Sequence, residues 1–287
     1  MKALLLGNTG QLGWELQRCL QPLGSIIAFD FPDVDMADAG CIRAKLRECR
    51  PDAVINATAY TAVDKAESEP ALAEKINGFA PGVLAEEARK LKALLIHYST
   101  DYIFDGKKGV PYIESDLPDP LNVYGASKWH GEQSIQQAGG DYLILRTSWV
   151  YSLRQGGFVN KVLDWSRRQQ TLRMVSDQVG NPTWCRMLAE ATAHLLARGD
   201  AYLRERTGLY HLAGSGFASR YEWAKSILEL DPHQSEQTVK ELVPALTSEF
   251  PSPAQRPLFS ALDCSRFQAT FGLELPDWRV ALRLALA

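Results

Sequence analysis

The chain has 287 residues, of which 46% are hydrophobic and 23% are charged, a composition typical of folded globular proteins rather than disordered ones. The 31 Lys and Arg residues nearly balance the 34 Asp and Glu residues, and a net charge of −3 argues against nucleic-acid binding. No apolar run approaches a membrane span, and we expect no signal peptide, because a short strand-like run directly follows Met1. The five scattered cysteines contain no CxxC pair, so we expect reduced thiols in a cytoplasmic protein without zinc.

The first half alternates short apolar runs with amphipathic segments. Strands are predicted at the ranges 2–6, 25–30, 53–56, 93–99 and 142–147. Helices are predicted at the ranges 11–20, 41–49, 70–92 (broken near Pro81) and 123–137. This alternation predicts an α/β fold, a Rossmann-type doubly wound parallel sheet with helices on both faces. We therefore assign residues 1–150 to a dinucleotide-binding domain.

After about Trp149 the elements become shorter, and Pro and Gly become more frequent. Helices are predicted at 157–168, 185–196 and 220–230, and short strands at 172–175 and 208–212. Residues 244–262 contain four prolines and are predicted to form an ordered loop. We assign residues 151–287 to a smaller α/β substrate-binding domain that is partly interleaved with the first.

A glycine-rich turn, G-x-x-G-x-x-G, follows the first predicted strand and opens a helix, with glycines at Gly7, Gly10 and Gly13. Glycine permits a tight turn and close approach of a pyrophosphate, which the free N–H groups of the helix N-terminus stabilise. Alone, the triplet would indicate only a tight strand–helix connection. Asp30 ends the second predicted strand, however, where a carboxylate binds the adenosine ribose hydroxyls. Its charge would repel a 2′-phosphate, so we expect NADH to be accepted readily. The sequence leaves NADPH open as the alternative cofactor.

Tyr124 and Lys128 lie four residues apart on a predicted helix and therefore on one face. A surface tyrosine with a solvated lysine is the commoner explanation of such a pair. A lysine cation beside the phenol would favour the phenolate and lower the pKa of Tyr124, which suits acid–base chemistry. Thr100 follows the predicted strand 93–99, at the sheet edge where ligands bind, and could hydrogen-bond the same reacting oxygen.

Over essentially its whole length, the chain resembles the extended short-chain dehydrogenase/reductase superfamily, and within it the dTDP-4-dehydrorhamnose reductase family. The resemblance is carried by the segments 7–13, 61–67, 98–104, 120–125, 128, 131–132, 146–151, 177–180, 182–183 and 208–211. The strings RTSWVY and STDYIF are far more specific than the Tyr124–Lys128 pair.

The resemblance implies reduction, by NADH or NADPH, of the C4 keto group of dTDP-4-dehydro-β-L-rhamnose, with a dTDP-sugar as the small-molecule partner. Tyr124 would donate the proton, Lys128 would hold the nicotinamide ribose, and Thr100 would orient the carbonyl. The expected cofactor-binding residues are Gly7, Thr9, Gly10, Gln11, Leu12, Gly13, Asp30, Asp35, Met36, Ala59, Tyr60, Thr61, Tyr98, Tyr102, Tyr124 and Lys128. The expected substrate-binding residues are Thr100, Asp101 beside the sugar, Trp149 as a wall of its pocket, and Arg256 paired with the diphosphate.

Two departures from the family pattern stand out. Leu258, Phe259 and Ser260 replace the Asn and Ser that usually follow the Arg-Pro pair. Some members bind Mg²⁺ at a dimer contact through glutamates, and Glu190 fits one position, but residues 279–287 contain no carboxylate side chain. We therefore expect no bound metal. The protein is expected to be a monomer or a homodimer. We expect it to bind neither nucleic acid nor membrane.

Two alternatives remain open from the sequence. A nucleotide-sugar epimerase shares the fold, whereas a dehydratase is disfavoured because Tyr102 stands where dehydratases of this group have a glutamate. A non-catalytic NADP-binding regulatory subunit, like that of methionine adenosyltransferase, is the second alternative, although Thr100, Tyr124 and Lys128 are all retained. The substrate could also be another nucleotide sugar.

Overall fold

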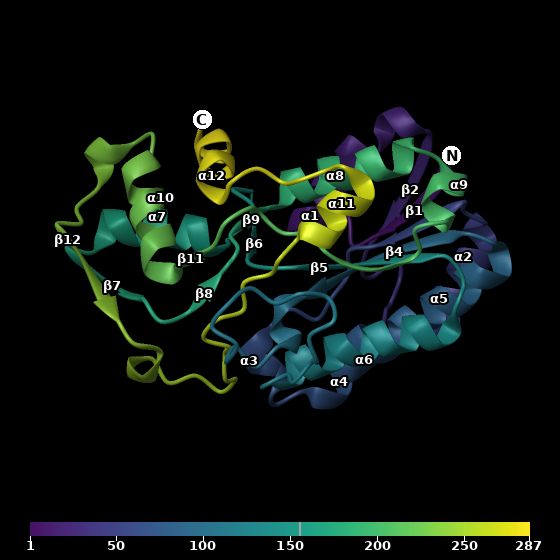
Figure 1. The fold of residues 1–287 in the computed structure, drawn as a ribbon, viewed down its shortest axis with the longest axis horizontal. Helices are drawn as coiled ribbons and strands as arrows, with labels where there is room; N and C mark the ends of the chain where they lie inside the picture. The colour runs from purple at the N-terminus through teal and green to yellow at the C-terminus, as the bar shows by residue number, and fades with distance from the viewer. Residues whose placement is uncertain (155) are drawn as a thin grey trace.

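A six-stranded parallel sheet forms the centre of the protein, seen here in a computed structural model that describes residues 1–154 and 156–287 (Figure 1). Its strands, in spatial order, are β10 (Gly208–His211), β5 (Tyr142–Thr147), β4 (Leu94–Thr100), β3 (Ala53–Asn56), β1 (Lys2–Leu6) and β2 (Ser25–Phe29). The chain runs outward from β1 to β2 and then crosses to β3 on the other side of β1. The connections that leave the carboxyl ends of β1 and β3 therefore run in opposite directions, and such a switch point is where open α/β sheets bind ligands.

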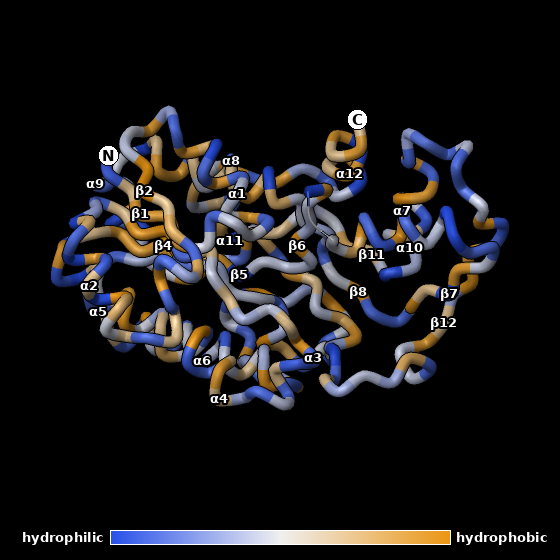
Figure 2. Tube along the Cα trace, turned by 180° about the vertical axis from the view of Figure 1, so that it is seen from behind, coloured by the Kyte–Doolittle hydropathy of each residue, from blue (hydrophilic) through white to orange (hydrophobic). Residues whose placement is uncertain are grey.

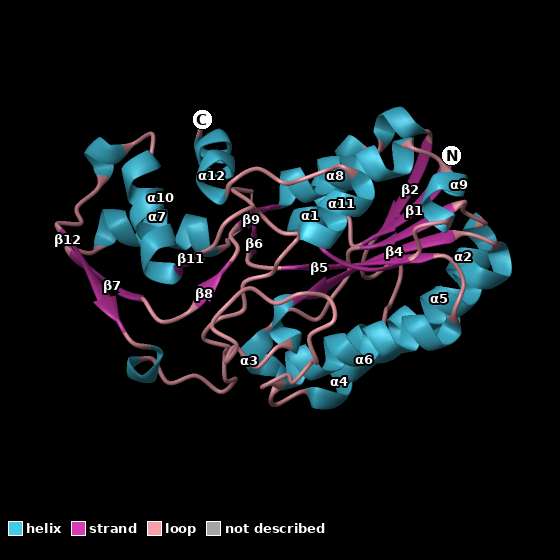
Figure 3. Cartoon of the chain, viewed as in Figure 1, coloured by secondary structure: helices cyan, strands magenta, loops and turns pink. Residues whose placement is uncertain are grey.

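Helices cover both faces of this sheet, as the sequence predicts (Figure 3). One face carries α1 (Gln11–Cys19), α8 (Cys185–Ala197) and α11 (Ser265–Phe271), which bury Leu16 and Leu195 against it. The other face carries α2 (Ala39–Cys49), α5 (Ala80–Leu91) and α6 (Val123–Ala138), which bury Leu46, Leu84 and Ile135. Figure 2 shows the hydrophobic strands β1 and β2 between these layers. Burial of apolar surface on both faces explains why the strands are mostly apolar rather than alternating in polarity.

The helix expected to break near Pro81 is continuous there, and its hydrogen bonding changes just before the proline. The segment consists of α4 (Pro70–Glu74), a π-helical turn (Lys75–Phe79) and α5, without a break at the proline. Pro81 lies in the first turn of α5, which continues directly from the π-helical turn. The prediction of a break at Pro81 was therefore wrong.

The region after residue 150 builds a second hydrophobic core at the end of the molecule opposite β2 (Figure 1). It comprises α7 (Phe158–Arg168), α10 (Arg220–Leu230) and α12 (Trp278–Leu286), around Trp223 and Trp278. Three two-stranded pairings border it: β7 (Thr171–Val175) with β12 (Glu241–Ala245), β8 (Val179–Gly180) with β11 (Ala218–Ser219), and β6 (Val150–Tyr151) with β9 (Thr183–Trp184). The short helices α3 (Val63–Ala66) and α9 (Asp200–Arg204) lie in the connections.

The chain returns from this second region to the main sheet, because β10 pairs with β5 and α8 packs on α1. The two regions are thus built from interleaved segments, and the separate binding roles assigned to residues 1–150 and 151–287 stay a prediction. Within the ranges 1–154 and 156–287, no helix is long and apolar enough to cross a membrane.

Candidate active site

A cavity of about 720 Å³ lies at the carboxyl ends of the sheet strands. Most of the residues predicted to bind cofactor or substrate line it, although they come from distant parts of the chain. The predicted residues that line the cavity are Gly7, Thr9, Gly10, Gln11, Leu12, Asp30, Asp35, Met36, Ala59, Thr61, Tyr98, Thr100, Asp101, Tyr102, Tyr124, Lys128 and Trp149. Gly13, Tyr60 and Arg256 do not line it.

The glycine-rich turn at one end of the cavity requires glycine for two separate reasons. Gly7 has φ +87°, and a Cβ there would lie 2.9 Å from the Ala57 carbonyl carbon. A Cβ on Gly13 would lie 1.9 Å from the Gly7 carbonyl oxygen, so Gly13 serves the packing of α1 rather than the cavity wall. The turn leaves the N-terminus of α1 open to the cavity, which is the cradle that a dinucleotide pyrophosphate needs.

Asp30 closes the same end of the cavity. Its carboxylate accepts hydrogen bonds from the backbone N–H of Thr9 at 3.1 Å and from the Thr9 hydroxyl at 2.5 Å. The other carboxylate oxygen accepts from the N–H of Phe31 at 2.8 Å. These bonds fix Asp30 beside the glycine-rich turn, and Asp35 and Met36 line the wall next to it.

The segment after β3 forms one wall of the cavity through Ala59 and Thr61. The Tyr60 side chain instead leaves the cavity, and its hydroxyl donates to Glu69 at 2.5 Å. Asn77, in the π-helical turn, accepts from the N–H of Tyr60 at 2.8 Å and donates to the Tyr60 carbonyl at 3.1 Å. Its amide also donates to the Ser127 hydroxyl at 3.1 Å, so one buried side chain ties this wall to α6.

The start of α6 positions Tyr124 and Lys128. The Asn122 side chain caps the helix by accepting from the N–H of Gly125 at 2.8 Å. A Cβ on Gly125 would lie 2.2 Å from the Tyr102 carbonyl oxygen, so only glycine allows α6 to approach the segment after β4 so closely. This close approach brings the Tyr124 hydroxyl to Thr100, at the end of β4.

The structure corrects the expected effect of Lys128 on Tyr124. Burial raises the pKa of Tyr124, against the smaller lowering effect of the Thr100 hydroxyl. Lys128 Nζ instead donates to the carbonyl oxygen of Tyr98 at 2.7 Å and lies 3.2 Å from His97 Nε2. Burial lowers the pKa of Lys128 to about 8. Tyr124 is therefore a neutral phenol at neutral pH, which is the protonation state of a proton donor.

Asp101 lies buried beside Thr100 and accepts hydrogen bonds from three hydroxyl groups. These come from Ser260 at 2.5 Å, Ser148 at 3.0 Å and Thr100 at 3.2 Å. Burial raises the pKa of Asp101, while the three hydroxyls oppose that shift. Ser260 belongs to the stretch that departs from the family pattern, and here it anchors that stretch to the cavity floor.

Trp149 forms the far wall of the cavity and has an unusual backbone conformation, with φ +44°. A Cβ on Gly180 would lie 2.6 Å from its ring, so the missing side chain there makes room for the indole. The guanidinium of Arg220, the first residue of α10, lies 3.6 Å from the Trp149 ring centroid and also lines the cavity.

The structure does not place Arg256 in the cavity wall. Its guanidinium donates to the Asp64 carboxylate at 2.7 and 3.0 Å, and to the Ser252 hydroxyl and Ala254 carbonyl oxygen. Arg256 thereby fastens residues 252–256 to α3. The pairing of Arg256 with the substrate's diphosphate stays a prediction, and in this structure Asp64 holds the guanidinium outside the cavity.

Comparison with known proteins agrees with this geometry. A family model described as RmlD substrate binding domain matches residues 1–287. The dTDP-4-dehydrorhamnose reductases of Burkholderia thailandensis and Escherichia coli are 41% and 40% identical to this chain, over all of it and over 98% and 97% of their own lengths. The chain belongs to the dTDP-4-dehydrorhamnose reductase family.

Solved structures of this reductase family share the whole fold. The dTDP-4-dehydrorhamnose reductase of Clostridium acetobutylicum matches with a TM-score of 0.92 and 33% identity, covering 100% of this chain and 98% of that one. That of Bacillus anthracis, solved in complex with NADP, matches with a TM-score of 0.90 and 32% identity, covering 99% of this chain and 97% of that one. The expected family and α/β fold are thus confirmed.

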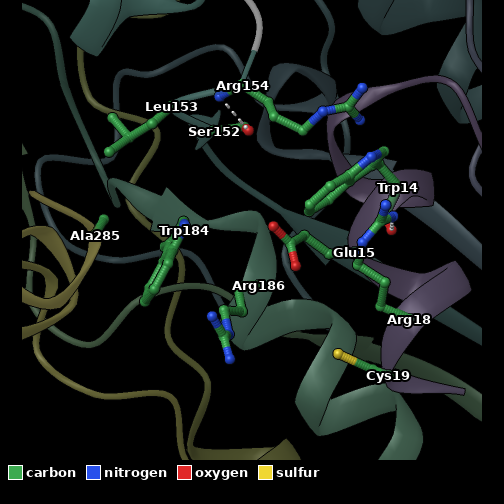
Figure 4. Close-up of a pocket in the computed structure, with 10 residues that line it drawn as sticks. All are labelled: Trp14, Glu15, Arg18, Cys19, Ser152, Leu153, Arg154, Trp184, Arg186 and Ala285. Carbon is green, nitrogen blue, oxygen red and sulfur yellow. Dashed lines mark hydrogen bonds between the residues drawn. The ribbon is translucent and has the colours of Figure 1, made fainter.

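The residues that family resemblance points to for Mg²⁺ do not fit a metal in this chain. Glu190 pairs with Arg186 at 3.0 Å, so its charge is already balanced. Figure 4 shows Arg186 and Arg18 near Glu15, in a second cavity of about 480 Å³ that opens between α1 and α8. Among the described residues, no group of three or more His, Cys, Asp or Glu side chains could hold a metal ion.

Three residues of this reductase-family site escaped the sequence analysis, and Ser260 was noted only as part of a departure from the family pattern. Arg220, Asn77 and His97 are scattered along the chain and belong to no short motif at which their partners could be predicted. The polar residues Asn77 and His97 do stand within apolar helix and strand patterns, which is the only local signal of a buried hydrogen-bonded role.

Proposed function

We propose that this protein reduces the C4 keto group of dTDP-4-dehydro-β-L-rhamnose to give dTDP-L-rhamnose, with NADH or NADPH as the reductant. One observation carries this proposal. A single cavity joins a glycine-rich dinucleotide cradle at one end to Thr100, Tyr124 and Lys128 further along it. The curated reductases at about 40% identity over the full chain support the choice of substrate.

Each residue of the site has one role in the proposed reaction. A bound nicotinamide cofactor supplies the hydride. Tyr124 donates its phenolic proton to the substrate oxygen, because a developing alkoxide is more basic than a phenolate. Thr100, next to the Tyr124 hydroxyl, orients the same carbonyl oxygen by turning its own hydroxyl from Asp101 toward it. Lys128, held by the Tyr98 carbonyl, binds the nicotinamide ribose.

We further propose that this enzyme prefers NADH. The adenosine end of the cavity is lined by Asp30 and Asp35, whereas the lining cations Lys128 and Arg220 lie at the catalytic and far ends. A 2′-phosphate would carry about −1.5 to −2 charges into this acidic region, where none of the described lining residues is a cation. The expectation of a monomer or homodimer is a separate prediction, which a solution mass from light scattering tests.

The decisive experiment supplies dTDP-4-dehydrorhamnose with either reduced cofactor, follows the loss of its absorbance, and identifies the product sugar. We expect stoichiometric cofactor oxidation and dTDP-L-rhamnose as product. An epimerase would regenerate its cofactor and consume none, and a non-catalytic subunit would bind it without turnover. Either of these results would refute the proposed function.

A further inference from the structure

We propose that Arg220 binds the diphosphate of the nucleotide-sugar substrate, the role that family resemblance gives to Arg256. This inference rests on the proposed function, because it takes the substrate to be a nucleoside diphosphate sugar. It adds to that function the residue that selects for the diphosphate.

Arg220 is held by aromatic side chains rather than by a carboxylate. Its guanidinium carbon lies 3.6 Å from the Trp149 ring centroid, 4.9 Å from that of Phe158 and 5.4 Å from that of Trp223. Stacking uses the flat face of a guanidinium and leaves the N–H groups at its edge able to donate. The Tyr102 hydroxyl takes part of that edge, and the other N–H groups remain available. Those N–H groups form a planar fork that matches two phosphate oxygens.

Within the part of the chain that the structure describes, no salt bridge pairs Arg220 with an Asp or Glu oxygen within 4.0 Å, and the buried Asp101 acts on its charge only from farther away. The groups that face it are Asp101, the Tyr102 hydroxyl and Arg256. Burial lowers the pKa of Arg220, which reflects the cost of holding its charge away from water. An anionic ligand in the cavity would supply the missing negative charge.

Arg256, unlike Arg220, is paired with a carboxylate. It also lies near the Tyr102 hydroxyl, but Asp64 accepts two hydrogen bonds from it and neutralises its charge. A diphosphate would have to displace Asp64 to gain the same contact. Of the two arginines beside Tyr102, Arg220 is therefore the one already prepared for an anion.

The position of Arg220 assigns it to the substrate rather than to the cofactor. The cofactor cradle lies at the start of α1, whereas Arg220 begins α10 in the second region of the protein (Figure 1). Tyr102 connects Arg220 to the catalytic group, since its ring packs edge-on against Tyr124 with centroids 5.7 Å apart. Arg220 thus lies beyond Tyr124, on the side where Trp149 forms the wall.

The test compares Arg220→Met and Arg220→Gln with Arg256→Met, using dTDP and thymidine as calorimetric probes and the dTDP-sugar as substrate. We expect both Arg220 variants to weaken dTDP binding and raise the substrate KM by about 10- to 100-fold, the usual effect of losing hydrogen bonds to a charged group. Thymidine binding and the KM for NADH should remain as in the parent. Arg279→Met is the matched control, because its guanidinium stacks on Trp278 at 4.2 Å outside the cavity.

Parent-like dTDP affinity in a folded Arg220 variant would overturn the proposal, as would a larger loss in Arg256→Met. Two uncharged variants are used so that a folding defect in one leaves the other to decide, with thermal melting as the check. If the parent binds dTDP through Arg220 but does not reduce the sugar, the result supports this inference and refutes the proposed function.

Discussion

Nζ of Lys128 lies 3.2 Å from Nε2 of His97, in the buried layer between α6 and β4. On the other side of the imidazole, Asn56 Nδ2 lies 3.0 Å from Nδ1. The Asn56 amide oxygen accepts from the backbone N–H of Thr58 at 3.1 Å. A backbone N–H can only donate, so the Asn56 NH₂ group faces His97 and donates to its Nδ1.

The direction of these bonds has a consequence for Lys128. Burial lowers the pKa of His97, so the imidazole is neutral, and its hydrogen must lie on Nε2 because Nδ1 accepts. An ammonium group has no lone pair to accept that hydrogen. The contact with His97 therefore opposes protonation of Lys128, in the same direction as burial, while Glu132 on the next turn favours it.

We predict that kcat/KM for NADH falls as pH rises through about 8, where Lys128 loses the charge that holds the ribose. In His97→Gln an amide oxygen can face Nζ, so the pKa of Lys128 should rise and this alkaline limb should move to higher pH. His211→Gln is the control, since His211 is a buried histidine outside the cavity. An alkaline limb that stays in place in His97→Gln would contradict this account of Lys128.

Replacing Tyr124 by Phe removes the proposed proton donor. We expect kcat to fall by at least about a hundredfold, the usual scale for loss of a general acid, while NADH binds nearly as before. Steady-state kinetics and a calorimetric titration measure the two effects. Tyr112→Phe is the matched control, because its hydroxyl contacts Asp105 away from the cavity. Turnover at the parent rate would remove Tyr124 from its assigned role.

Asp30→Ala should shift cofactor preference toward NADPH. The substitution removes a carboxylate that would repel the 2′-phosphate, and it also releases the two bonds to Thr9. The measurement is the ratio of kcat/KM for NADH to that for NADPH. Asp33→Ala removes the same charge from an exposed residue that does not line the cavity, so its ratio should match the parent. An unchanged ratio in Asp30→Ala would show that its carboxylate does not contact the ribose.

Acid should destabilise the protein through His211. Burial lowers its pKa from 6.5 to about 3, with Arg146 adding to the shift. As pH falls below 6.5, the unfolded chain takes up a proton at this residue that the folded protein does not. Between pH 6.5 and about 3, the contribution of His211 to the free energy of unfolding should therefore fall by about 1.4 kcal/mol per pH unit.

Denaturant titrations of the parent and His211→Gln across that window measure this contribution. The variant should show a shallower loss of stability with acid, because one proton-binding difference is gone. Equal slopes in the two proteins would mean that His211 does not carry the effect.

The ranges of most helices and strands follow from the sequence, because each depends on contacts within a few residues. Residues 3–6 form a continuous apolar run, and the helix of Tyr124 and Lys128 begins at an asparagine cap. The position of Gly208–His211 in the main sheet does not follow from sequence, since its partner strand lies some sixty residues earlier. The π-helical turn at Lys75–Phe79 likewise depends on Asn77 reaching Tyr60 and Ser127.

The glycine cradle, the carboxylate at Asp30 and the four-residue spacing of Tyr124 and Lys128 can be predicted from the sequence, because a turn, a strand end and one helical turn are local geometry. Which groups meet around them depends on the tertiary structure. Lys128 lies against His97, Arg256 pairs with Asp64, and Arg220 stacks on Trp149 without an ion pair among the described residues. Those outcomes depend on burial and on partners far apart in the chain, and neither is encoded in a short stretch of residues.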